Sequence, residues 1–129
     1  MTNRIAIITG GLGGIGLEIV NFFYNKNFNL IILDNKNVSE FLKKNINKSD
    51  RSNFVKYNKI DLSKPLLIKK LFIILKKKYS KIDVLINCAG IQHIDSLESF
   101  PEFKWEKIIN TNLSSSFYTS KYILPLMKK

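Results

Sequence analysis

The sequence contains a single cysteine, Cys88, among its 129 residues. One cysteine excludes an internal disulfide framework and leaves no partner for a cysteine-based metal site, so we expect no metal. No apolar run approaches the roughly 20 residues that a membrane-spanning helix needs. The apolar run Ile5 to Ile8 is short and stops at Thr9, without the small-residue cleavage site of a signal peptide. These absences predict a cytoplasmic protein.

Acidic residues are scarce as well. The chain has 10 Asp and Glu against 21 Lys and Arg, which gives a formal net charge of +11. Clustered positive charge attracts nucleic acids and anionic membranes. Here the lysines are distributed along the chain, and the densest run, Lys76 to Lys78, ends an apolar helical stretch, where cations suit the helix C-terminus. We therefore expect neither nucleic acid nor membrane as a partner.

Hydrophobic residues make up 45% of the chain, enough for the core of one domain over residues 1–129. Short apolar runs of strand length alternate with longer segments of helical periodicity, which is typical of βαβ units with a parallel sheet. The predicted strands are residues 4–9, 29–33, 54–60 and 82–87. The predicted helices are residues 14–25, 38–46 (weak) and 63–78, and a long one from about residue 101.

Local signals refine the last two predicted helices. Ser63 is expected to cap the third helix, with Pro65 in its first turn, and Ser99 with Glu102 has the spacing of a capping box for the last helix. Apolar residues then recur at three- and four-residue steps, so one face of the last helix is expected to be buried, with Trp105 in the core. The residues of this face are Trp105, Ile108, Ile109, Asn112, Leu113, Phe117 and Ile123.

Glycine is concentrated in one loop. Five of the six glycines lie between Gly10 and Gly16, where the first predicted strand gives way to the first predicted helix. There glycine lets the backbone approach a pyrophosphate, and the helix N-terminus offers free N–H groups to the phosphates. Asp34 follows about 20 residues on, where a carboxylate can bind the adenine ribose hydroxyls and repel a 2′-phosphate. Since the glycine loop contains no Arg or Lys, we expect NAD as the cofactor.

Four motifs in chain order resemble those of the short-chain dehydrogenase/reductase family. They are Thr9-Gly10-x-x-x-Gly14-x-Gly16, Asp61-Leu62, Asn87-Cys88-Ala89-Gly90, in which Cys88 departs from the family pattern, and Asn112 within Asn-Thr-Asn-Leu-Ser. The resemblance implies an α/β fold, a Rossmann-type doubly wound parallel sheet, here truncated after the fourth strand and the long helix that follows it. It also implies that Asn112 is a catalytic residue, which anchors a proton-relaying water. The cofactor-binding residues that it implies are Thr9, Gly10, Leu12, Gly14, Ile15, Gly16, Asp34, Asp61, Leu62, Asn87, Ala89 and Gly90.

The segment Gly90-Ile91-Gln92-His93 is similar to bacterial D-3-hydroxybutyrate dehydrogenases, a branch of that family. This similarity implies a small hydroxy or keto acid as substrate, with Gln92 holding its carboxylate. His93 is interpreted as a loop or packing residue. A 3-oxoacyl-carrier-protein reductase is the main alternative, because such enzymes share the Asn-Leu-Ser-Ser run. Asp34 argues against it, since those reductases usually use NADP.

The family's general acid/base is a tyrosine, supported by a lysine four residues later and by a serine that polarises the substrate oxygen. None of the five tyrosines in the sequence has a lysine four residues on. We therefore expect residues 1–129 to be the NAD-binding N-terminal half of a dehydrogenase domain, inactive alone and homo-oligomeric when complete. The fourth predicted strand would then be an uncovered sheet edge. A nucleotide-binding fragment without catalysis is the alternative.

Overall fold

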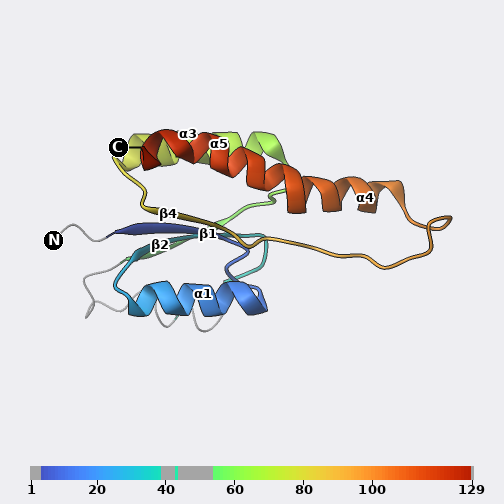
Figure 1. Cartoon of the computed structure of the whole chain (residues 1–129), viewed down its shortest axis with the longest axis horizontal. Helices are drawn as coiled ribbons and strands as arrows, with labels where there is room; N and C mark the ends of the chain where they lie inside the picture. The colour runs from blue at the N-terminus through green and yellow to red at the C-terminus, as the bar shows by residue number, and fades with distance from the viewer. Residues whose placement is uncertain (1–3, 39–42, 44–53, 129) are drawn as a thin grey trace.

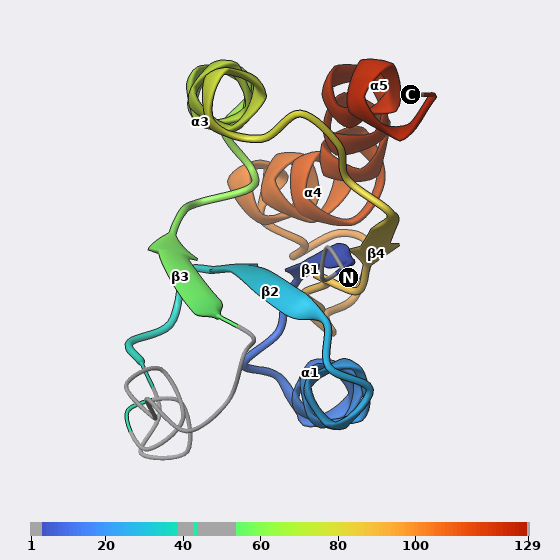
Figure 2. The same ribbon diagram turned by 90° about the vertical axis from the view of Figure 1, so that its left-hand side faces the viewer.

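The computed structural model describes residues 4–38, 43 and 54–128, and within them the chain folds as a four-stranded parallel sheet between two layers of helices. The strand order is β3-β2-β1-β4, with bounds β1 (Ile5–Thr9), β2 (Asn29–Asp34), β3 (Val55–Lys59) and β4 (Val84–Asn87). The helix α1 (Gly14–Asn25) covers one face, and α3 (Pro65–Lys78), α4 (Glu102–Ile109) and α5 (Ser115–Met127) lie on the other (Figures 1 and 2). The predicted Rossmann-type sheet is confirmed. The helix predicted over residues 38–46 lies, apart from Val38 and Lys43, outside the described residues.

The two inner strands, β1 and β2, have apolar sequences without interruption because both of their faces are buried. Successive side chains of a strand point to opposite faces, and both faces of this sheet are covered by helices. Ile7 and Ile31 pack toward α3 and α5, whereas Ile8 and Ile32 pack toward α1, and all four are 0% exposed. β1 pairs with both β2 and β4, and β2 with both β1 and β3, so these two are the inner strands of the described sheet, and β4 is an edge of it, as expected.

The start of α3 differs from its predicted capping. Pro65 occupies the first turn, as predicted, but the N-cap is Lys64, which makes no side-chain capping hydrogen bond. The Ser63 hydroxyl instead donates to Asp61 Oδ1 at 2.6 Å, so the predicted Ser63 cap is wrong. The reason is that α3 begins at Pro65 with Lys64 as its N-cap, so Ser63 lies one residue too early to cap the helix. Lys76, Lys77 and Lys78 do lie in the last turn.

The last predicted helix is present but is not uniform. It begins at Glu102 after Pro101, and Ser99 contacts Ser96 and not the helix, so the predicted capping box is wrong. Between α4 and α5 the chain forms a π-helical segment, η1 (Asn110–Ser114). Hydroxyl groups here donate to main-chain carbonyls, as Ser115 does to Thr111 at 2.5 Å, and this competes with regular helical bonding.

The apolar face predicted for this helix is only partly buried. Ile123 is 0% exposed against the sheet, but Trp105, Leu113 and Phe117 are 59%, 66% and 59% exposed. The prediction that Trp105 belongs to the core is therefore wrong. The periodicity marks the apolar side of the helix correctly, but within the described residues no element packs over this side of α4 and η1.

Asp83, the residue before β4, links the start of that strand to the start of β1. Its Oδ2 accepts a hydrogen bond from the Ile5 N–H at 2.9 Å, and its Oδ1 lies 2.9 Å from Lys81 Nζ. Burial alone would raise the pKa of Asp83, but the Ile5 and Lys81 donors outweigh it and hold the pKa below its usual value. The contact therefore stabilises the fold at neutral pH.

We expect Asp83→Asn to lower the free energy of unfolding by about 1–2 kcal/mol at pH 7, the usual magnitude for a charge-assisted hydrogen bond. A depressed pKa gives a stabilisation that is full above the unfolded-state value of about 4 and is lost as the pH falls through the folded-state value. The difference between the two proteins should thus shrink below pH 4 in urea unfolding. Glu18→Gln, on the exposed side of α1, is the control and should change neither the free energy of unfolding nor its dependence on pH.

Candidate functional site

A cleft of about 630 Å³ opens at the carboxyl ends of the strands. Its walls come from the loop after β1, the end of β2, the residues after β3, the segment after β4, and α4 with η1. In an open parallel sheet, ligands bind where neighbouring strands connect in opposite directions, and β1 with β4 forms that point here. The predicted site residues that line the cleft are Gly10, Gly14, Ile15, Gly16, Asp34, Asp61, Leu62, Ala89, Gly90 and Gln92.

The glycine loop owes its shape to close backbone contacts. Gly10 has a φ of +66°, and a Cβ there would lie 2.6 Å from Ala89 Cα. A Cβ on Gly16 would lie 1.9 Å from the Gly10 carbonyl oxygen, so α1 can begin only with glycine at this position. Gly14 is different, because a Cβ would meet nothing within 4 Å although the residue lines the cleft. The fold itself therefore does not require a glycine at position 14.

Asp34 is held at the end of β2 by two main-chain donors. The Leu12 N–H donates to its Oδ2 at 2.9 Å, and the Lys36 N–H donates to its Oδ1 at 3.0 Å. Its residue exposure is 6%, yet it lines the cleft. Leu12 itself is outside the lining and acts through this bond, which fixes the glycine loop against β2. The free lone pairs of the carboxylate are left for a ligand.

Tyr57 on β3 holds the main chain at the end of β2, where Asp34 lies. Its single hydroxyl hydrogen is shared between two acceptors, the main-chain carbonyl of Asp34 at 3.1 Å and that of Lys36. Burial, followed by the negative charge of Asp34, raises the pKa of Tyr57, so the hydroxyl keeps its proton. Neither Tyr57 nor its role was predicted, because the connection between residues 34 and 57 is visible only once β3 pairs with β2.

Three lysines also line the cleft and were not predicted as site residues: Lys36, Lys104 and Lys107. No cation was predicted at the site because the glycine loop contains no Arg or Lys. Lys36 follows Asp34 by two residues, and the two lysines of α4 reach the cleft through the fold. The cleft is therefore suited to anionic groups, which agrees with a phosphate-containing ligand.

Asp61 and Leu62 form the wall that follows β3. Burial raises the pKa of Asp61, but hydrogen bonds from the Ser63 side chain and amide, together with the charges of Lys107 and Lys64, hold the pKa below its usual value. The carboxylate is thus ionised and fixed. Leu62 is 5% exposed and belongs both to the core and to the cleft wall. Such a pair offers one polar and one apolar contact to a planar group.

Thr9 and Asn87 lie outside the cleft lining, at the ends of β1 and β4. Thr9 Oγ1 accepts hydrogen bonds from the N–H groups of Cys88 and Ala89, both at 3.1 Å. Asn87 Oδ1 accepts the Thr119 hydroxyl hydrogen at 2.7 Å, which joins β4 to α5. Both residues therefore position the segment that follows β4, and in this structure neither side chain faces the cleft.

Asn112 also lies outside the lining, within η1. Its Oδ1 accepts the Ile91 N–H and its Nδ2 donates to the Ile91 carbonyl, both at 2.9 Å. The side chain therefore pairs with the backbone of the segment after β4 like a neighbouring strand. Single π turns often occur at functional sites, and here the turn brings Asn112 to Ile91. The structure shows a residue that orders this segment, and its predicted catalytic role stays a prediction.

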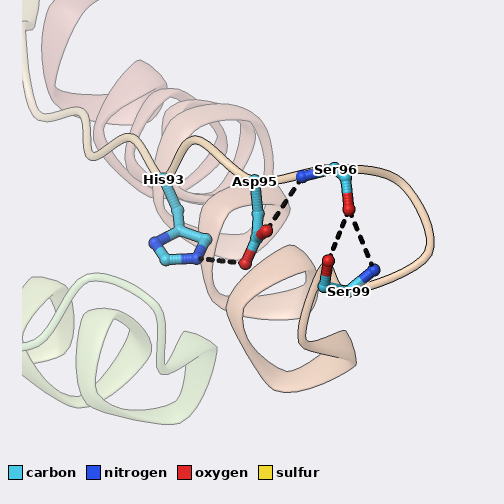
Figure 3. A network of polar contacts seen from close by, with 4 residues as sticks. All are labelled: His93, Asp95, Ser96 and Ser99. Atoms are coloured by element: carbon cyan, nitrogen blue, oxygen red, sulfur yellow. Dashed lines mark hydrogen bonds and ion pairs between the residues drawn. The ribbon is translucent and has the colours of Figure 1, made fainter.

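Gln92 and His93 line the cleft at the start of a projecting loop (Figure 1). His93 Nε2 lies 3.6 Å from Asp95 Oδ2, which is an ion-pair distance and too long for a hydrogen bond. Asp95 Oδ1 accepts the Ser96 N–H at 2.9 Å, and Ser96 contacts Ser99, so the loop is held by its own polar groups (Figure 3). His93 thus has the loop position that the sequence predicted.

Comparison with known proteins shows which family shares this arrangement. The profile of the short chain dehydrogenases matches residues 4–129. D-beta-hydroxybutyrate dehydrogenase of Cupriavidus necator is 32% identical over 129 residues, which are all of this chain and 50% of that protein. A 3-oxoacyl-[acyl-carrier-protein] reductase of Buchnera aphidicola is 34% identical over 99% of this chain and 51% of its own length. The solved structure of 4-hydroxyisoleucine dehydrogenase complexed with NADH superposes with a TM-score of 0.82 at 33% identity, covering 95% of this chain and 49% of that one.

The chain spans about half the length of the curated relatives that it matches. The matched half includes the strands, the glycine loop and the cleft described above.

Proposed function

Because the chain belongs to the short-chain dehydrogenase family, we propose that its cleft binds NAD and that it is the NAD-binding half of an oxidoreductase. The observation that carries this proposal is Gly14, which lines the cleft although the fold itself would tolerate a side chain there. A position kept free of a Cβ at the start of a helix suits the close approach of a pyrophosphate.

The residues present fit a dinucleotide in a defined direction. Gly10, Gly14, Ile15 and Gly16 would hold the pyrophosphate at the start of α1, with Thr9 and Leu12 supporting the loop. The adenosine would lie toward Asp34, Asp61 and Leu62, beside Ala89 and Gly90 of the segment after β4, which Asn87 helps to position. When bound, NAD supplies the acceptor for a hydride taken from an alcohol carbon. The chain's own residues bind and orient it there.

We propose NAD over NADP because the Asp34 carboxylate would repel a 2′-phosphate. Lys36 in the same cleft wall works in the opposite direction, so the preference depends on Asp34 remaining charged and in place. The Leu12 and Lys36 N–H groups supply that restraint. We further propose a cytoplasmic protein that forms a homo-oligomer in its complete form and has no nucleic-acid partner; no helix among the described residues has both the length and the apolarity to cross a bilayer.

Asp34→Ala is expected to relax the cofactor preference. In the unmodified chain, isothermal titration should give a lower Kd for NAD than for NADP, and the substitution should weaken NAD binding about tenfold while strengthening NADP binding. Lys36→Gln, which leaves the carboxylate in place, is the control and should weaken only NADP. Equal affinity for the two cofactors in the unmodified chain would contradict the proposal.

For the substrate we propose a small hydroxy acid such as D-3-hydroxybutyrate, with Gln92 holding its carboxylate and Asn112 anchoring a proton-relaying water. The support is that Gln92 lines the cleft beyond Gly90 and that the C. necator relative carries that activity in its name. The B. aphidicola relative supports a 3-oxoacyl-carrier-protein reductase as the second candidate. An NADP-preferring chain would favour the reductase.

Gln92→Ala in the complete enzyme is expected to raise KM for D-3-hydroxybutyrate about tenfold with little change in kcat. The reason is that a hydrogen bond to the carboxylate is made equally in the ground state and the transition state. Steady-state kinetics at 340 nm measure both constants. His93→Gln is the matched control in the next position of the same cleft wall, and a KM that responds to it but not to Gln92→Ala would remove this substrate assignment.

A further inference from the structure

The outward side of α3 carries apolar and basic side chains together, and we call it the α3 outer surface. Four large apolar residues are exposed on it, Leu66, Leu67, Ile73 and Ile74, at 61%, 39%, 46% and 59%. Five lysines share it, Lys69, Lys70, Lys76, Lys77 and Lys78. The inner side of the same helix, with Ile68, Phe72 and Leu75, is buried against the sheet. The helix therefore has a complete core-facing side and a second apolar surface that the core does not use.

This surface follows from a repeat in the sequence. Residues 66–72 read LLIKKLF and residues 73–79 read IILKKKY, so apolar and lysine positions recur after seven residues, except that Lys78 stands where Leu71 would recur. Seven residues make almost two helical turns, which places Leu66 beside Ile73 and Lys70 beside Lys77 along the helix. The mixture of apolar and basic groups thus extends over the whole length of α3, on the outer layer of the molecule opposite α1 (Figure 2).

Within the described residues, no carboxylate neutralises the positive charge of the α3 outer surface. The helix PLLIKKLFIILKKK contains no acidic residue. In the part of the chain that the structure describes, none of its five lysines lies within ion-pair distance of a carboxylate; the ion pair of Lys64 with Asp61, at 4.0 Å, precedes the helix. Contact with Lys56 and repulsion from its charge lower the pKa of Lys78, which reflects how closely cations gather here. These lysines are therefore available to an external anion.

The apolar part of the surface continues into a shallow groove between α3 and β3. The groove has a volume of about 430 Å³ and is lined by Leu67, Leu71 and Ile74 on the helix and by Tyr57, Asn58, Lys59 and Ile60 on the strand side. It lies beside β3, which is an edge of the described sheet. The helix side of the groove is aliphatic and its strand side includes a further lysine, so exposed aliphatic side chains and lysines together match a partner that is both anionic and apolar.

We propose that the α3 outer surface docks the protein on an anionic phospholipid bilayer. Its lysines would meet the phosphate groups, and Leu66, Ile73 and Ile74 would enter the boundary between headgroups and acyl chains. The expectation of no membrane partner rested on lysines distributed along the chain, but α3 alone carries five of them, and the fold leaves them exposed together with Leu and Ile. Nucleic acid fits less well, because single-strand binding relies on stacking aromatics and arginine, and α3 exposes neither.

The test is co-sedimentation of the chain with lipid vesicles. Vesicles of phosphatidylcholine with 30% phosphatidylglycerol are expected to bind the protein, pure phosphatidylcholine vesicles are not, and 1 M salt should release it, because the Debye length falls to about 3 Å. Ile73→Gln with Lys77→Gln should weaken partitioning at least about 20-fold, from roughly fivefold for one lysine and a similar factor for one buried aliphatic side chain.

Phe22→Gln with Lys26→Gln is the matched control, because it removes one exposed apolar residue and one lysine at the same spacing from α1, on the opposite layer. It should change partitioning less than threefold. All four positions are exposed, and far-UV circular dichroism checks that both variants fold. Equal losses for the two double variants would mean that the net charge alone binds lipid, and would overturn the proposal, as would binding to heparin without binding to the vesicles. Titration with NAD tests the proposed cofactor site separately, because NAD affinity does not depend on whether the α3 outer surface binds lipid.

Discussion

Residues 1–129 alone are expected to oxidise D-3-hydroxybutyrate at no measurable rate, even when saturated with NAD. The reason is chemical: removal of the alcohol proton needs a positioned base, and general acid/base help is worth roughly 10²- to 10⁴-fold in rate. No tyrosine in these residues has a lysine four positions on. Asn112 cannot replace such a base, since an amide does not take up a proton near neutral pH.

The structure also argues against a catalytic role for Tyr118 with Lys121, the tyrosine and lysine whose spacing is nearest to the family's. Tyr118 and Lys121 lie on the same helix at a similar spacing, but Tyr118 stacks on Tyr122 with ring centroids 6.2 Å apart, and Lys121 Nζ lies over the Phe117 ring at 5.6 Å. Neither residue lines the cleft.

The assay follows absorbance at 340 nm with the chain whose folding has been checked by circular dichroism and whose NAD binding has been checked by calorimetry. Robust turnover that survives Tyr118→Phe would show that another residue acts as the base. Turnover that Tyr118→Phe abolishes would assign the role to Tyr118. Either result would contradict the prediction, and NAD binding without turnover would support it.

The sheet and its order could be predicted because the strands are buried on both faces. Ile7 and Ile8 face opposite helix layers and are equally inaccessible, so the sequence carries an unbroken apolar run that periodicity identifies. The glycine loop could be predicted from the sequence for a related reason. Gly10 and Gly16 lie so close to other backbone atoms that only glycine fits at these positions. These features are local in sequence or repeat along it.

The features that were missed depend on contacts between distant residues. Asn112 finds the Ile91 backbone 21 positions away, and Tyr57 reaches the end of β2 only after β3 has paired with it. Ser63 and Ser99 were predicted as helix caps from spacing, but α3 and α4 begin one and two residues later than these caps require, with Lys64 and Pro101 at the N-cap positions. The exposure of Trp105 could not be foreseen either, since periodicity shows which face of a helix is apolar and not what covers it.

Gly16→Ala and Gly14→Ala are expected to have opposite effects, although they lie two residues apart on α1. A Cβ added at Gly16 would lie 1.9 Å from the Gly10 carbonyl oxygen, and this oxygen belongs to backbone that is itself held by the Leu33 carbonyl through the Gly10 N–H at 2.7 Å. Neither side can give way without opening the glycine loop. We expect Gly16→Ala to lower the free energy of unfolding by about 3 kcal/mol or more, at the upper end of the range for overpacking.

Gly14→Ala should leave the free energy of unfolding unchanged or raise it by up to about 1 kcal/mol, because alanine is the better helix former and its Cβ meets no atom within 4 Å. The same methyl group would project into the cleft and should weaken NAD binding at least tenfold. Urea unfolding and NAD calorimetry on both variants separate the two roles of glycine. A stable Gly14→Ala variant with unchanged NAD affinity would show that the cofactor does not approach this turn, and the proposed position of the pyrophosphate would be wrong.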